Sequence, residues 1–249
     1  MQVIRTFKLG VASLLVAAAW PASAGLVTTI NTSALEANAR LDFSTDAVEA
    51  MNGVGISRTA LGTSKAIGTG GVSFNMPVTS ATTELNLLPP SLTSVAGSSM
   101  GAALGLTSGS NSLILGNFNL DFKNKVVKAD AWANGVKSSL NVYTFNIAQG
   151  LTLSTTGGLS LHEVIDHLAL TSAAADTFAS ALKISPLLKP VLTMLDYGSI
   201  TIDIKPALRS GGAVSGKAYN PPPVPEPGTY ALVGLGLLAA ACVARRKSA

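Results

Sequence analysis

Residues 113–148 read LILGNFNLDFKNKVVKADAWANGVKSSLNVYTFNIA, and this stretch decides the fold. Apolar Phe118, Leu120 and Phe122 alternate with polar residues, and a period of two is typical of a strand with one buried face. Residues 123–125 are polar, and a second apolar stretch follows them. The pattern predicts a β-hairpin.

A second turn signal, Asn134-Gly135, comes directly after this hairpin. This dipeptide suits the left-handed backbone of tight hairpin loops. Beyond it, Tyr143, Phe145 and Ile147 are spaced to share one face of a further strand. Three strands in succession predict an antiparallel meander.

Two more windows alternate in the same way, residues 72–78 and residues 200–204. Pro77 lies in the first window and has no N–H to donate, so it predicts an edge position or a bulge. The second window predicts a short strand before Pro206.

Helices are predicted in the remaining periodic segments. Residues 46–51 form a short helix, with Ser44 or Thr45 as N-cap and Gly53 as the stop. Ser160 and Glu163 have the spacing of a capping box, and apolar residues follow at helical intervals. They predict two short helices within residues 160–183, broken near 171–172, and a further helix within 186–197.

The body, residues 25–219, is therefore expected to be a mainly β domain. We expect an antiparallel, sandwich-like sheet with a short helical insertion. Two glycine-rich segments, residues 61–71 and 91–109, are expected to be mobile loops.

The N-terminus has the layout of a secretory signal peptide, residues 1–24. Arg5 and Lys8 form a basic region, and residues 9–20 are apolar but too few for a resident membrane helix. Signal peptidase is expected to cut after an A-x-A site, following passage through the Sec translocon. The residues that define this cleavage are Ala22, Ala24 and Gly25.

The C-terminus has three parts. Residues 220–228 form a proline-rich linker, which should be extended and solvated because proline fixes φ and removes a donor. Residues 229–244 are apolar and are expected to form a transmembrane helix. Residues 245–249 form a basic tail that should stay in the cytoplasm, and its membrane-stop residues are Arg245, Arg246 and Lys247.

This layout closely resembles the PEP-CTERM sorting signal of Gram-negative bacteria, with a sorting motif formed by Val224, Pro225, Glu226 and Pro227. The resemblance implies a transient partner, an exosortase, which is a membrane transpeptidase that recognises the motif and cuts nearby. It also implies a protein held in the inner membrane before sorting and found at the cell surface or outside the cell afterwards.

The charge of the chain belongs to these terminal segments. Of 17 basic and 13 acidic residues, five basic and one acidic lie in them, which leaves twelve of each in the body. A neutral body has no footprint for nucleic acid. The one basic cluster, Lys123, Lys125 and Lys128, is diluted by Asp121 and Asp130, and predicts a solvated hairpin edge.

Cysteine chemistry is not expected in the body. Cys242 is the only cysteine and lies in the apolar tail. The exported part therefore has no disulfide, thiol nucleophile or thiolate metal site.

One segment matches the nucleophile-elbow pattern, residues 97–101 with Ser99 at the centre. Candidate acids and bases follow in hydrolase order: Asp121, Asp130, His162 and His167. A nucleophile elbow needs a strand before the serine and a helix after it, whereas glycines and prolines here favour a loop. We expect no catalytic residues.

The sequence contains two other candidate sites. His162 and His167 are five residues apart, and a zincin motif needs four so that both imidazoles share a helix face. We therefore expect no metal and no cofactor. Trp132 is the best candidate for a glycan platform, although packing suits it better.

The leading hypothesis is therefore a non-enzymatic exported protein of the cell surface or of the extracellular polysaccharide matrix of a biofilm. The alternative is a secreted module that binds a glycan, another surface protein or ice. A hydrolase is the third reading. Matrix polysaccharide is the one partner of the body that the leading hypothesis suggests.

Overall fold

The computed structural model describes residues 25–87, 90–155 and 159–222. Strands dominate this part, as the sequence predicts. The strands are β1 (Leu26–Asn31), β2 (Leu35–Phe43), β3 (Ser57–Gly62), β4 (Lys65–Ile67), β5 (Ser73–Pro77), β6 (Ser80–Leu87), β7 (Pro90–Ser108), β8 (Asn111–Asp121), β9 (Val126–Ala133), β10 (Val136–Ser154), β11 (Ser160–Leu170) and β12 (Gly198–Leu208).

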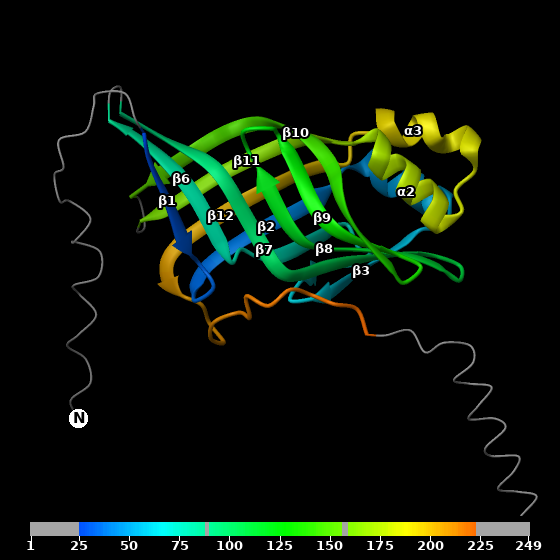
Figure 1. Cartoon of the computed structure of the whole chain (residues 1–249), viewed down its shortest axis with the longest axis horizontal. Coiled ribbons are helices and arrows are strands. Elements are labelled where there is room, and N and C mark those ends of the chain that lie inside the picture. The colour runs from blue at the N-terminus through cyan, green and yellow to red at the C-terminus, as the bar shows by residue number, and fades with distance from the viewer. Residues whose placement is uncertain (1–24, 88–89, 156–158, 223–249) are drawn as a thin grey trace, which may run out of the picture.

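All of these strands belong to one antiparallel sheet. Its order is β1-β6-β7-β8-β9-β10-β11-β12-β2-β5-β4, and β3 pairs with β7. From β6 to β12 the strands follow each other in sequence order, so the predicted meander is confirmed and extends further than expected. The two facing sheets of a sandwich are not formed, because one sheet curls instead (Figure 1).

The curl closes through one continuous segment. Only Val78 and Thr79 lie between β5, which pairs with β2, and β6, which pairs with β7. The Val78 N–H donates to the Ala37 carbonyl of β2, and the Thr79 N–H donates to the Ser98 carbonyl of β7. The sheet therefore has an inner face, which alternate residues of each strand fill.

The core lies inside this curl. Phe118, Leu120 and Phe122 are all buried, as predicted, and the Phe122 ring meets the Phe145 ring edge-on at 5.7 Å. Ile147 differs from the prediction, since it is 41% exposed. Register shifts between β10 and β11 on both sides of it break the alternation.

The helices gather at one end of the curled sheet (Figure 1). They are α1 (Thr45–Gly53), α2 (Ser172–Leu182), the 3-10 turn η1 (Pro186–Leu188) and α3 (Lys189–Met194). The Ser44 hydroxyl accepts from the Ala47 N–H and caps α1, as predicted. Thr171 caps α2 in the same way, at the break that the sequence predicts.

The helix predicted from residue 160 is wrong, because this segment is strand β11 between β10 and β12. His167 has a φ of 49° and forms a bulge, so Ile165 and Leu168 both point into the core. A bulged strand therefore buries residues three apart and imitates the spacing of a helix. Glu163 does not form a capping box, and it too is buried.

The loop predicted over residues 91–109 is also wrong, because this segment is the long strand β7. Its small residues are needed for close packing: a Cβ on Gly105 would lie 2.7 Å from the Thr59 hydroxyl of β3. The loop predicted over 61–71 contains strand β4. Pro77 lies beyond the end of β4, where β5 pairs on one side only, as predicted.

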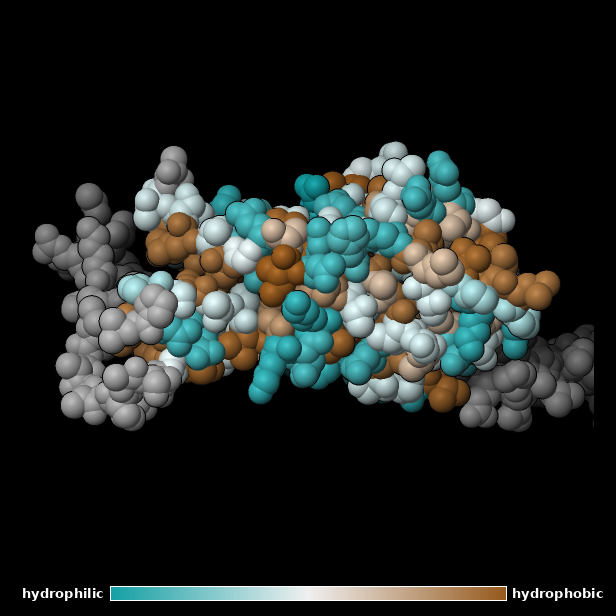
Figure 2. Space-filling view, turned by 90° about the horizontal axis from the view of Figure 1, so that it is seen from above, coloured by the Kyte–Doolittle hydropathy of each residue, from teal (hydrophilic) through white to brown (hydrophobic). Residues whose placement is uncertain are grey.

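The signal peptide, the apolar segment 229–244 and the basic tail lie outside the described residues. None of the helices in the described ranges has the length and hydrophobicity to cross a membrane. Hydrophobic residues reach the surface over the helical end and at the opposite end of the molecule (Figure 2).

Candidate functional site

A strap, residues 209–222, follows β12 and returns along the outside of the sheet (Figure 1). Its first part is fixed by the Arg209 N–H, which donates to the Ala34 carbonyl, and by the Val214 N–H, which donates to the Ser33 carbonyl. The strap then crosses to β7 and β8. It is the last described segment before the predicted sorting motif.

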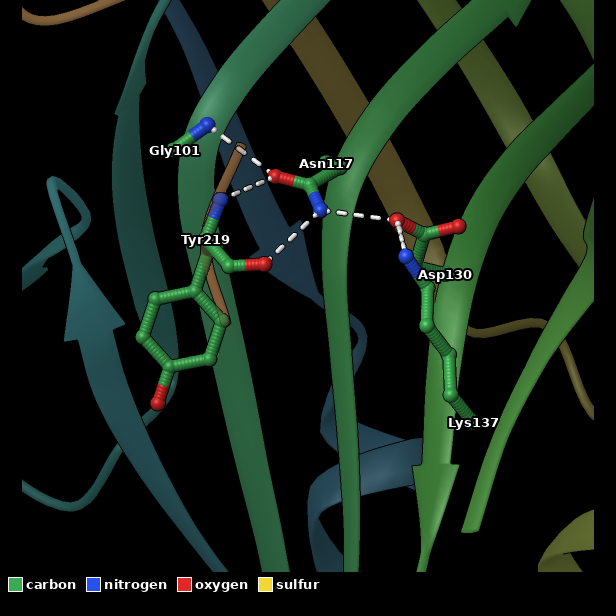
Figure 3. A network of polar contacts seen from close by, with 5 residues as sticks. All are labelled: Gly101, Asn117, Asp130, Lys137 and Tyr219. Atoms are coloured by element: carbon green, nitrogen blue, oxygen red, sulfur yellow. Dashed lines mark hydrogen bonds and ion pairs between the residues drawn. The ribbon is translucent and has the colours of Figure 1, made fainter. Parts of the chain in front are cut away.

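Asn117 of β8 clamps the strap at Tyr219 (Figure 3). Its side-chain oxygen accepts from the Tyr219 N–H at 2.6 Å and from the Gly101 N–H at 3.2 Å. Its amide nitrogen donates to the Tyr219 carbonyl at 3.0 Å and to Asp130 at 2.8 Å. One buried amide thus uses its full donor and acceptor capacity and holds both backbone groups of Tyr219.

The clamp depends on two unusual backbone positions. Asn117 has a φ of 55°, a left-handed conformation that asparagine tolerates better than most residues. Gly101 has a φ of 83°, and a Cβ there would lie 2.9 Å from the Lys217 carbonyl of the strap. Only glycine lets the strap come this close to β7.

Trp132, the candidate for a glycan platform, packs against the clamp. Its ring meets the Tyr219 ring edge-on at 5.8 Å, and the Lys137 ammonium lies 5.2 Å from its centroid. Lys137 also pairs with Asp130 at 3.0 Å. Trp132 is only 5% exposed, so the packing role that the sequence favoured is confirmed.

The clamp lies close to the sorting motif in the sequence. Residues 220–223 separate Tyr219 from Val224. A fully extended chain covers at most about 18 Å over this separation. Tyr219 is therefore anchored to β8 with only four residues between it and the motif in the sequence.

A second candidate site is a cleft inside the curl, at the end away from the helices. β6 and β7 line one side, and β11 and β12 line the other. The cleft is small: it has about 30 Å³ of space for water, which is room for one or two water molecules. Most of its lining is apolar, with serine and threonine residues and Glu163 as the polar part.

Glu163 and Ser94 form the polar floor of this cleft. The Ser94 hydroxyl donates to the Glu163 carboxylate at 2.5 Å and connects β7 with β11, which are not neighbours in the sheet. Glu163 is 3% exposed, and no Lys, Arg or His of the described residues forms an ion pair with it. Burial raises the pKa of the Glu163 carboxyl, and the bond from Ser94 opposes this shift.

This raised pKa predicts how stability changes with pH. The folded protein holds the Glu163 proton more tightly than the unfolded chain does, so its stability falls as pH rises above the ordinary glutamate pKa of about 4.3. Glu163→Gln lacks this titration. Urea unfolding from pH 4 to pH 8 should show the variant gaining stability over wild type as pH rises. Glu84→Gln, with the charge outside the cleft, is the control, and an equally flat difference for both variants would contradict the prediction.

The mouth of the cleft is aliphatic. Leu161 and Ile204 line the cleft, and Leu153 is paired with Leu161 and shares its face. On the other side, Leu85 pairs with Leu92 and follows the lining residue Thr83 by two positions. The full set, called here the mouth cluster, is Leu26, Leu85, Leu87, Leu92, Leu151, Leu153, Leu161 and Ile204.

The residues of the hydrolase reading do not come together. Ser99 is buried on β7, and within the described ranges no hydrogen bond joins it to a histidine. His162 bonds to Asp203 at 2.8 Å, whereas His167 lies 3.0 Å from Asp196. The two candidate acids have other partners. Asp121 forms an ion pair with Lys128, and Asp130 accepts a hydrogen bond from Asn117 of the clamp.

The two histidines are also unsuited to a shared metal. They belong to a strand, and each is bonded to a different aspartate. Among the described residues no group of three His, Cys, Asp or Glu side chains is placed to hold a metal ion.

Comparison with known proteins identifies the tail. Residues 223–247 match the family model of the PEP-CTERM protein-sorting motif, which confirms the resemblance seen in the sequence. The chain is therefore an exported protein whose signal is recognised by an exosortase. The match leaves the body without a family, and no curated protein or solved structure matches the chain significantly.

Proposed function

We propose that the protein is a non-enzymatic component of the cell surface or of the extracellular polysaccharide matrix. The observation that carries this proposal is the clamp at Asn117, which holds Tyr219 on the folded body with only four residues between it and the sorting motif. The body is then delivered as a folded unit. Matrix polysaccharide is its proposed partner.

The proposed route has three steps. The Sec translocon exports the chain through the inner membrane of a Gram-negative bacterium, and signal peptidase cuts before Gly25. Residues 229–244 hold the precursor in the membrane, with residues 245–249 in the cytoplasm. The exosortase then cuts near Pro225, Glu226 and Pro227 and releases the body.

The polar contacts of the body support a structural role. His162 and His167 are each engaged by an aspartate, and Asp130 is used by the clamp. These aspartates leave the second ring nitrogen of each histidine available, but Ser99, the candidate nucleophile, is buried and forms no hydrogen bond to a histidine within the described ranges, so no nucleophile–base pair is assembled there.

Complementation of a deletion strain tests the non-enzymatic role. Variants Ser99→Ala and His162→Gln should restore wild-type matrix mass and wild-type retention of the protein in the matrix fraction. Failure of Ser99→Ala to complement, with normal amounts of folded protein, would instead favour the hydrolase reading. Deletion of the gene with no change in the matrix or the cell surface would contradict the proposed role.

A second candidate function is a secreted ligand-binding module, and the aliphatic cleft favours it. The glycan form of this reading depended on Trp132, which Tyr219 now covers. The cleft favours an apolar ligand, because its apolar lining is mainly aliphatic, with Phe122 as the one aromatic residue.

The role of the Asn117 amide in holding the strap can be tested by substitution. Asn117→Gly removes the amide but accepts the left-handed φ without strain, so its effect reports the lost hydrogen bonds. We expect a loss of about 2 kcal/mol in the free energy of unfolding. Trypsin should also cut after Lys217 much faster, because the strap is released.

Asn119→Gly is the matched control, since Asn119 is an exposed residue of the same strand. It should leave cleavage after Lys217 at the wild-type rate. Equal cleavage of the two variants would show that the amide of Asn117 does not hold the strap.

A further inference from the structure

Two hairpin ends form an open mouth around the cleft. The β6–β7 and β10–β11 hairpins extend beyond the closed part of the sheet, and the mouth cluster covers their inner faces. Leu87 is 71% exposed and Leu153 is 57% exposed, although both belong to the face that is the core elsewhere. From the floor at Thr83 to Leu87 the chain advances about 13 Å.

The floor carries a carboxyl group that lacks a cationic partner within the described residues. Buried charges in proteins are normally paired, and an unpaired one is costly. Glu163 accepts one hydrogen bond, from Ser94, and lines the cleft, which has room for one or two water molecules. An ammonium group is about the size of a water molecule and supplies the missing charge.

We propose that the cleft binds a single-chain amphiphile with an ammonium head. The head lies at the floor against Glu163 and Ser94, and the alkyl chain lies along the mouth cluster. This inference deepens the second candidate function, ligand binding by the body, and rests on it.

The head-first orientation follows from the distribution of polarity. A chain that entered tail-first would place apolar carbon against the Glu163 carboxylate and leave its head among exposed leucines. The opposite orientation pairs charge with charge and covers Leu85, Leu87 and Leu153 with methylene groups. An anionic head is disfavoured because it would repel Glu163.

Calorimetric titration tests the proposal on the sorted protein isolated from the surface of its native host. The probes are dodecylamine, dodecanoate and butylamine, each below any micelle-forming concentration at pH 7. Dodecylamine should bind about tenfold or more tightly than dodecanoate, because it alone pairs with Glu163. Butylamine should bind much more weakly than dodecylamine, because it covers little of the mouth cluster.

Two variants separate the head from the chain. Glu163→Gln should reduce the preference for dodecylamine to about twofold or less, whereas Glu84→Gln, on the outer face of the same hairpin region, should keep it. Leu153→Asn should weaken both twelve-carbon probes. Leu153 is exposed, so this variant should keep the wild-type fold.

Each contrary result has a distinct meaning. Equal binding of dodecylamine and dodecanoate, or an unchanged preference in Glu163→Gln, would overturn the head assignment while ligand binding stands. No binding of any probe would overturn both the inference and the ligand-binding function. A dimer that Leu153→Asn dissociates would show that a second copy, and not an amphiphile, covers the mouth.

Discussion

Replacing Glu226 with Ala is expected to leave the protein uncut in the inner membrane. Residues 223–247 match the family model of the sorting motif. Glu226 is the charged residue between Pro225 and Pro227 in this match. Proline fixes φ and lacks an N–H, so the sequence predicts that Pro225 and Pro227 favour an extended chain, which suits binding in a transpeptidase cleft. Loss of both prolines should have the same effect. Fractionation of the native host with detection of the body measures the uncut form.

Glu49→Ala is the matched control, because it removes an exposed glutamate from α1 of the folded body. It should be sorted like wild type. Release of Glu226→Ala at the wild-type rate would show that the motif is not what the exosortase recognises.

Replacing Phe145 with Asp is expected to unfold the body. Phe145 is 3% exposed and its ring packs on Phe122 inside the curl. An unpaired carboxylate there costs several kcal/mol, in addition to the cavity left by the ring. That loss is comparable with the whole stability of a typical domain. Circular dichroism and thermal melting of the mature protein measure the effect.

Asn146→Asp is the control for this variant. It adds the same charge one residue further along β10, where the side chain is exposed. Its melting temperature should stay within a few degrees of wild type. A Phe145→Asp variant that melts like Asn146→Asp would contradict the inward assignment of this strand face.

Local signals were enough to predict a large part of the fold. Strict alternation identifies β8, and the Asn134-Gly135 turn connects β9 to β10, with both turn residues at positive φ. The cap at Ser44 marks the start of α1. In each case the signal and the structure that it specifies lie within a few residues of each other.

Local signals failed in segments whose secondary structure depends on the closure of the sheet. The small residues of β7 have the composition of a loop, but they form a strand because β3, β6 and β8 pair with it. In β11 the bulge at His167 imitates helical spacing. Neither the pairing nor the bulge can be read from the segment itself.

Both candidate sites depend on contacts between distant parts of the chain. Ser94 meets Glu163 across 69 residues, and Asn117 meets Tyr219 across 102. The spacing of Ser160 and Glu163 predicts a helix cap, which the structure does not form. The burial of Glu163 and its partner appear only when the sheet curls, so the sequence offered no direct signal for either site.

The intact mass of the protein released by the native host tests the central claim most directly. The expected species begins at Gly25 and ends close to Pro225–Pro227, without residues 229–249, and carries any group that the exosortase attaches. A released protein that retains the apolar segment, or that ends inside the strap at residues 209–222, would contradict sorting at the motif beyond the clamp.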